Sequence, residues 1–165
     1  MTAIDSLRAE FEHEARTTRK HLERIPDDTL DWRPHPRSFT VRGLASHLVE
    51  CVGWAGAILG ADEFDVNPAT YNGYRGASVA DLLSAFDAKV GGGQELLARL
   101  NDADLSQPWR LKIASRVRFE KPKAVVLRDF TLSHQIHHRG QLSVYLRLLD
   151  VPVPGSYGPT ADEPF

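Results

Sequence analysis

The sequence predicts an all-α protein, built as one four-helix bundle. Apolar residues recur at intervals of three and four along four long segments, which is the pattern of helices that bury one face. The connections between these segments contain prolines and glycines, which interrupt helices. The length of 165 residues is close to that of a single domain, so we treat residues 1–165 as one helical-bundle domain.

Composition argues against several classes of function. Hydrophobic residues make up 42% of the chain and charged residues 25%, which is the balance of an ordinary globular protein. The formal net charge of −2 argues against a general nucleic-acid binder, which usually carries a strong basic excess. The densest basic stretch, residues 110–123, is diluted by nearby acids and is best explained as a solvated loop. We therefore expect no nucleic-acid partner.

The sequence carries no clear membrane or secretion signal. No apolar run approaches the ~20 residues of a membrane helix. Residues 1–20 carry charges from the start, unlike a secretion signal. Cys51 is the single cysteine, which excludes an intrachain disulfide and fits a reducing compartment. We therefore expect a cytoplasmic protein without a membrane partner.

The first two helical segments begin at residues that cap helices well. The first spans about residues 2–24, with Thr2 or Asp5 as its N-cap. An extended connection with two closely spaced prolines follows it. The second segment spans about residues 41–59 after Thr40. Its core-facing stripe consists of Leu44, Leu48, Cys51, Ala55 and Ile58.

The third segment is less regular. It begins near Ser78, which forms an S-x-x-D capping pattern with Asp81. Three glycines at residues 91–93 interrupt its apolar positions, and in a helix interior they cost about 3 kcal/mol relative to alanine. We expect a bend, close packing or a break at this point. Residues 101–118 alternate weakly and predict either a loop or a short hairpin.

The fourth segment spans about residues 123–149 and follows Pro122, a residue tolerated at a helix start. Residues at steps of four and three form a bundle seam whose middle is polar. This seam consists of Leu127, Thr131, His134, His138, Gln141, Tyr145 and Leu148. The tail that follows contains several prolines, and we expect it to be extended.

His134 and His138 are predicted to point the same way from the fourth helix. Because a helix turns about 100° per residue, they lie roughly 6 Å apart along its axis, and both imidazoles can bind one ion at about 2.0–2.1 Å. The intervening run reads HQIHH, with Gln135 where H-E-x-x-H metalloproteases keep a glutamate, so we expect no protease mechanism. Spacing alone leaves a second interpretation open, in which both are hydrogen-bonded core residues.

A third ligand has to come from a facing helix, and His47 is the candidate. It lies on the core side of the second segment, one turn from Leu44 and Cys51. Three imidazoles leave a coordination position open, as in catalytic metal sites. They favour a borderline divalent ion, namely zinc, nickel, iron, cobalt or copper, over magnesium or calcium.

Other polar residues are candidates for the same pocket. Gln141 lies one turn beyond His138 and suits a hydrogen bond to a ligand or a bound water. Cys51 lies one turn after His47 and is either a fourth ligand or, as we favour, a small buried hydrophobe. The full set of candidates consists of Gln141, Cys51, His137 as a substitute ligand or packing residue, Tyr145, and His35 at a pocket mouth.

Two strings, HQIHHRGQLSVYLRLLDVPVP and LDWRPHPRSFTVRGLASHLVE, carry a family resemblance. Together they resemble the DinB/YfiT-like family, with its late H-x-x-H-H-R-G-Q run and one histidine inside the second helix. The resemblance extends over nearly the whole chain. It implies a four-helix bundle with up-down-down-up connections, a homodimer, and a metal held by three histidines that map onto His47, His134 and His138.

The resemblance also implies a class of function. The family includes S-transferases and isomerases that use low-molecular-weight thiols such as bacillithiol or mycothiol as co-substrates. This chain is too short for the extra C-terminal domain of the mycothiol-dependent isomerases, which argues against an isomerase. We expect a metal-dependent enzyme that activates a thiol or water and acts on a small-molecule substrate, as an S-transferase or hydrolase. The alternative is a non-catalytic dimeric module with a structural or sensing metal.

Overall fold

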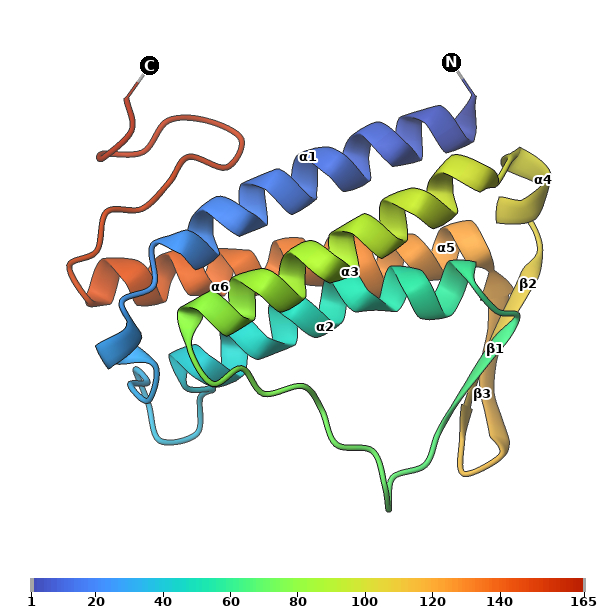
Figure 1. Cartoon of the computed structure of the whole chain (residues 1–165), viewed down its shortest axis with the longest axis horizontal. Coiled ribbons are helices and arrows are strands. Elements are labelled where there is room, and N and C mark those ends of the chain that lie inside the picture. The colour runs from blue at the N-terminus through green and yellow to red at the C-terminus, as the bar shows by residue number, and fades with distance from the viewer. Residues whose placement is uncertain (1, 165) are drawn as a thin grey trace.

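Four long helical segments lie side by side and form the body of the molecule (Figure 1). The computed structural model describes residues 2–164. The segments are α1 (Ala3–Glu23), α2 (Val41–Leu59), α3 (Val79–Arg99), and a last segment made of α5 (Lys123–Leu127), η2 (Arg128–Ser133) and α6 (His134–Leu148). The colours of Figure 1 show that α2 and α3 run in one direction and that α1 and the last segment run in the other. Two short helices, η1 (Asp27–Thr29) and α4 (Asp102–Leu105), lie in the connections.

The helix starts follow from capping chemistry. The Thr2 hydroxyl accepts a hydrogen bond from the Asp5 amide, and the Asp5 carboxylate accepts one from the Thr2 amide, which forms a capping box at α1. The Thr40 and Ser78 hydroxyls cap α2 and α3 in the same manner. These caps confirm the predicted starts of the first three helices.

The prediction of an all-α protein is wrong. Three strands, β1 (Glu63–Val66), β2 (Pro108–Ile113) and β3 (Arg116–Pro122), form a mixed sheet at one end of the helices (Figure 1). β1 pairs parallel to β2, and β2 pairs antiparallel to β3. Of the two alternatives for residues 101–118, the hairpin is therefore the correct one. The parallel partner β1 comes from the long connection between α2 and α3.

The sheet lacks the local signals by which hairpins are usually recognised. Its two-residue turn consists of Ala114 and Ser115, which have φ angles of 48° and 63° in place of the usual Asn-Gly pair. One face is anchored by Trp109, which is fully buried, and by the aligned Phe64 and Leu111. Tertiary packing of a few large side chains therefore overrides weak local preference.

The basic stretch at residues 110–123 belongs to this sheet. Lys112 Nζ lies 2.6 Å from Glu63 Oε1 on the neighbouring strand, and Arg110 pairs with Glu120. These ion pairs lie at the surface, where each contributes about 0–1 kcal/mol. The charges of these two basic residues are therefore balanced locally, which agrees with a solvated surface.

α3 continues through its three glycines without a break. A Cβ added at Gly93 would lie 2.7 Å from Phe11 Cζ and 3.2 Å from Ala55 Cβ. The glycine therefore lets α1 and α2 pack closely against α3. A Cβ at Gly91 or Gly92 would meet no atom within 4 Å. Close packing at Gly93 is therefore the correct alternative among those that the sequence left open.

We expect opposite effects from alanine at two of these glycines. Gly93→Ala should destabilise the protein by about 1–3 kcal/mol, because the buried Phe11 ring must move. Gly91→Ala should stabilise it by up to about 1 kcal/mol, because alanine favours a helix and meets no neighbour. Urea denaturation of both variants measures the difference, and equal shifts would contradict the packing role.

A buried ion pair connects α1 to α6. Arg139 Nη1 lies 2.6 Å from Glu14 Oε2, with the two side chains only 2% and 5% exposed. The Thr18 hydroxyl accepts a second bond from the guanidinium, 3.2 Å away. The Tyr157 hydroxyl from the C-terminal tail donates to Glu14 at 2.9 Å and accepts from Arg139 Nη2 at 2.7 Å. The network therefore holds two helices and the tail together.

Loss of one member of this hydrogen-bonded network should lower the free energy of unfolding of the protein. Glu14→Gln removes the charge opposite buried Arg139, and we expect the free energy of unfolding to fall by about 3–5 kcal/mol. Glu12→Gln is the matched control, because Glu12 forms an exposed pair with Arg16 on the same helix and should change stability by less than about 1 kcal/mol. Similar urea midpoints for the two variants would show that the buried pair is unimportant.

The length and the apolar character of a helix decide whether it could cross a membrane. Among residues 2–164, none of the helices combines the length and the apolar character that a membrane crossing requires.

Candidate metal centre

The structure brings the three predicted histidines together. His47 comes from α2, and His134 and His138 come from α6. Their ring centroids lie 4.9 Å apart for His47 and His134, 4.6 Å for His47 and His138, and 4.7 Å for His134 and His138. The Nε2 atoms of His47 and His134 are 3.3 Å apart. Three imidazole rings from two facing helices thus pack against one another.

A π-helix precedes the two histidines of α6. The wide turns of η2 end directly before His134, and such turns are frequent at functional sites. Leu148, predicted to lie on the seam, is 57% exposed, whereas Arg139, Leu142 and Leu146 are buried. The seam prediction is therefore wrong at its C-terminal end.

Hydrogen bonds orient two of the rings. His47 Nδ1 donates to Glu50 Oε2 at 3.0 Å, and His138 Nδ1 donates to Gln141 Oε1 at 2.7 Å. Glu50 is held in turn by the Tyr74 amide, which donates to its other oxygen, Oε1, at 2.9 Å. Partners of this kind fix the ring and its tautomer in metal sites, and they leave Nε2 as the free ligand atom.

Electrostatics keep the α6 histidines in the form that binds metal. Burial lowers the pKa of His134, and the neighbouring imidazoles of His138 and His47 lower it further. Burial also lowers the pKa of His138, although its hydrogen bond with Gln141 opposes this effect. Both rings are therefore neutral at pH 7, which is the form that ligates a metal ion.

The donor atoms fit a divalent transition metal. Because Glu50 keeps the proton of His47 on Nδ1, its Nε2 presents a lone pair to Nε2 of His134. The 3.3 Å between these atoms is close to the edge of a tetrahedron with bonds of about 2.0–2.1 Å. A cation between two such nitrogens relieves their repulsion and uses both lone pairs.

Cys51 is an alternative third donor. Among residues 2–164, the set of potential ligand atoms that lie within 4.8 Å of one another consists of His47, Cys51 and His134. Burial raises the pKa of the Cys51 thiol to about 12, with a further contribution from the Glu50 charge. Cys51 is therefore a buried neutral thiol in the metal-free chain, and the His138 ring packs on both other imidazoles.

The remaining sequence candidates divide into two groups. Gln141 and Tyr145 line a cavity of about 320 Å³ beside His138. His137 is exposed and packs its ring against His138 with centroids 4.8 Å apart. His35 is exposed, accepts a hydrogen bond from the backbone amide two residues later, and does not line this cavity.

Three residues of the centre were not predicted. Glu50 lies three residues after His47 on α2, which places the two side chains together. Phe39 stacks on the His47 ring with centroids 5.9 Å apart. Arg37 lines the cavity with Phe39, and no spacing rule connects the loop before α2 to α6.

Comparison with known proteins places the chain in a family. The sequence profile of the DinB family matches residues 1–164. The chain belongs to the DinB family. This confirms the resemblance carried by the H-x-x-H-H-R-G-Q run. This chain is also 27% identical over 165 residues to the protein YrdA of Bacillus subtilis (strain 168). The aligned region covers 97% of this chain and 91% of YrdA.

Solved structures of DinB-like proteins share the fold. A DinB-like protein from Bacillus cereus ATCC 10987 has a TM-score of 0.70 at 23% identity, covering 88% of this chain and 92% of that one. The DinB-like protein YjoA from Bacillus subtilis also has a TM-score of 0.70, at 18% identity, covering 92% and 96%. At these identities the likeness establishes the fold alone.

Removal of the Glu50 carboxylate should weaken the metal centre. Glu50→Ala leaves His47 Nδ1 without its acceptor, and we expect zinc affinity to fall by about 10–100-fold. Glu50→Gln should have an intermediate effect, because it keeps an acceptor oxygen and loses the charge. Competition with a chromophoric zinc chelator measures the affinity. The control is Glu95→Ala on α3, whose side chain is 75% exposed; an equal loss in that variant would refute the role of Glu50.

Proposed function

We propose that this DinB family protein is a metal-dependent enzyme that activates a small thiol, or water, at His47, His134 and His138. One observation carries the proposal: the three rings converge beside an open cavity of about 320 Å³ that His138 itself lines. A site with three protein ligands and access for a small molecule is the arrangement of catalytic rather than structural zinc.

The choice of His138 over Cys51 rests on the family resemblance and on the orientation of the ring. His138 Nδ1 donates to Gln141, and the ring packs on His47 and His134. Cys51 is the alternative donor, because its sulfur lies within 4.8 Å of the ligand atoms of His47 and His134.

The cavity residues suit the binding of a small-molecule substrate. Arg37 offers a cation for an anionic group, and Gln141 and Ser38 offer hydrogen bonds. The Phe39 ring stacks on His47 and adds an apolar surface to the cavity. A divalent ion, zinc or nickel in the first place and iron, cobalt or copper by the same donor chemistry, lowers the pKa of a coordinated thiol or water.

In the S-transfer reaction, the thiol releases its proton and its sulfur forms a bond to an electrophilic carbon of the second substrate. The leaving group departs from that carbon with the bonding electrons. The protein holds both molecules in contact within the cavity. This converts a bimolecular step into an effectively unimolecular one. Hydrolysis differs only in that water replaces the thiol.

The second candidate is a non-catalytic module with a structural or sensing metal. The proximity of Cys51 to His47 and His134 favours it, since a fourth protein ligand would close the coordination shell. A homodimer, implied by the family resemblance, is compatible with both candidates and is part of the proposal.

Metal content tests the ligand set. Purified protein should carry up to one transition metal ion per chain, and His138→Ala should lose most of it. His137→Ala is the matched control, because the neighbouring ring is exposed and should leave the metal content unchanged. Elemental analysis that finds full occupancy in a His134→Ala, His138→Ala double variant would refute the assignment.

The spectrum of a cobalt-substituted sample separates the two candidates. A small thiol should add a sulfur-to-metal charge-transfer band that grows with its concentration and is absent after loss of the triad. Cys51→Ser should leave this band unchanged. If saturating thiol has no effect and Cys51→Ser alters the cobalt spectrum instead, Cys51 closes the site and the metal is structural.

A further inference from the structure

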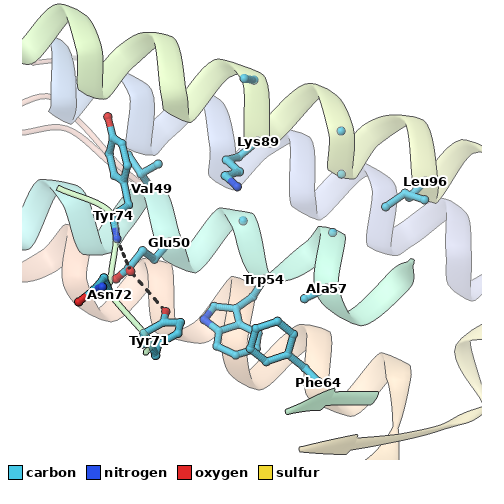
Figure 2. A pocket seen from close by; sticks show the side chains of 15 residues that line it. Val49, Glu50, Trp54, Ala57, Phe64, Tyr71, Asn72, Tyr74, Lys89 and Leu96 are labelled. Atoms are coloured by element: carbon cyan, nitrogen blue, oxygen red, sulfur yellow. Dashed lines mark hydrogen bonds between the residues drawn. The ribbon is translucent and has the colours of Figure 1, made fainter. Parts of the chain in front are cut away.

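A second cavity, of about 480 Å³, lies between α2 and α3 (Figure 2). Its volume falls within the range of small-molecule sites, about 300–1,000 Å³. The segment that connects β1 to α3 contributes one wall, through Tyr71 and Tyr74. None of the three metal-centre histidines lines this cavity.

The floor of the cavity is formed by glycines. Gly56 on α2 and Gly92 on α3 both line it, and a Cβ added at either would meet no atom within 4 Å. The absence of side chains therefore leaves open space beside the two helices at these positions. Such a floor admits the face of a planar ring.

The walls are largely aromatic. Trp54 and Phe64 pack edge to face, with ring centroids 5.2 Å apart. Figure 2 shows these two rings side by side, with Tyr71 on the same side of α2. Aromatic walls of this kind contribute apolar area and edge-to-face contacts to a bound ring.

Two charged side chains, Lys89 and Glu50, line the cavity. Lys89 points from α3 toward Trp54 (Figure 2), and its stem crosses Gly53, where an added Cβ would lie 3.2 Å from Lys89 Cδ. Lys89 takes part in none of the ion pairs formed within residues 2–164. The Glu50 carboxylate, by contrast, already accepts hydrogen bonds from His47 and Tyr74.

We propose that this cavity is a binding site for a small organic acid with a flat aromatic body. The ring lies on Gly56 and Gly92 against Trp54, and the carboxylate or sulfonate pairs with Lys89. The charge complementarity favours an anion over a neutral or cationic ring of the same size. The cavity shares Glu50 with the surroundings of the metal centre, but none of the three histidines lines it, so we expect binding to require neither the metal nor the histidines.

Calorimetric titration with naphthalene-2-sulfonate tests the proposal on the full chain. Gly92→Leu places a side chain in the space that the naphthalene ring would occupy, and should weaken binding by more than about tenfold. Gly91→Leu is the matched control, because that position is equally open and does not line the cavity. Gly56→Leu on the other helix repeats the test should Gly92→Leu fail to fold.

Two further variants assign the charge and the location. Lys89→Met should weaken binding of the sulfonate by about tenfold or more and leave binding of neutral 2-naphthol nearly unchanged. His138→Ala should bind the sulfonate like the unmodified protein. Unchanged binding in Gly92→Leu, or lost binding in His138→Ala, would overturn the proposal. Conversion of a dimer to a monomer by Gly92→Leu in light scattering would also overturn it, because a second copy would then cover the cavity.

Discussion

The buried Arg139–Glu14 pair sets the rotation of α6, and the metal centre depends on that rotation. A guanidinium inside the bundle has to face its carboxylate, because an unpaired buried charge costs several kcal/mol. Successive helix residues are turned by about 100°. With Arg139 held toward α1, the preceding residue, His138, is directed toward α2, where it meets His47. Tyr157 adds the C-terminal tail to the same network.

The sequence predicted what is encoded locally. Apolar spacing and caps such as Thr40 and Ser78 located the helices, since both signals arise within a few residues of one another. The sheet was missed because β1 pairs with β2 from a distant part of the chain, and because Ala114 and Ser115 adopt positive φ without the glycine or asparagine that would announce the turn. Strand pairing is a tertiary property, and no local pattern here carries it.

For the candidate site too, the features encoded locally were predictable and those that depend on tertiary contacts were not. His134 and His138 were predictable as a pair because one helix fixes their spacing, and His47 was predictable from its place on the core side of the second segment. Their partners were harder to predict. The role of Glu50 depends on the Tyr74 amide, which binds the carboxylate that accepts from His47. Tyr74 belongs to an irregular segment, whose position the sequence does not predict. Arg37 and Phe39 reach the site from a loop whose path the sequence does not specify.

Glu50 explains why the irregular segment before α3 belongs to the scaffold of the metal centre. One carboxylate oxygen accepts from His47 Nδ1, and the other accepts from the Tyr74 amide. A carboxylate held at both oxygens cannot rotate, so the backbone at Tyr74 determines the direction in which the His47 ring points. The side chains of Tyr71 and Tyr74 also form a wall of the cavity over Gly56 and Gly92. The position of this segment therefore determines both the orientation of His47 on α2 and the shape of the neighbouring cavity.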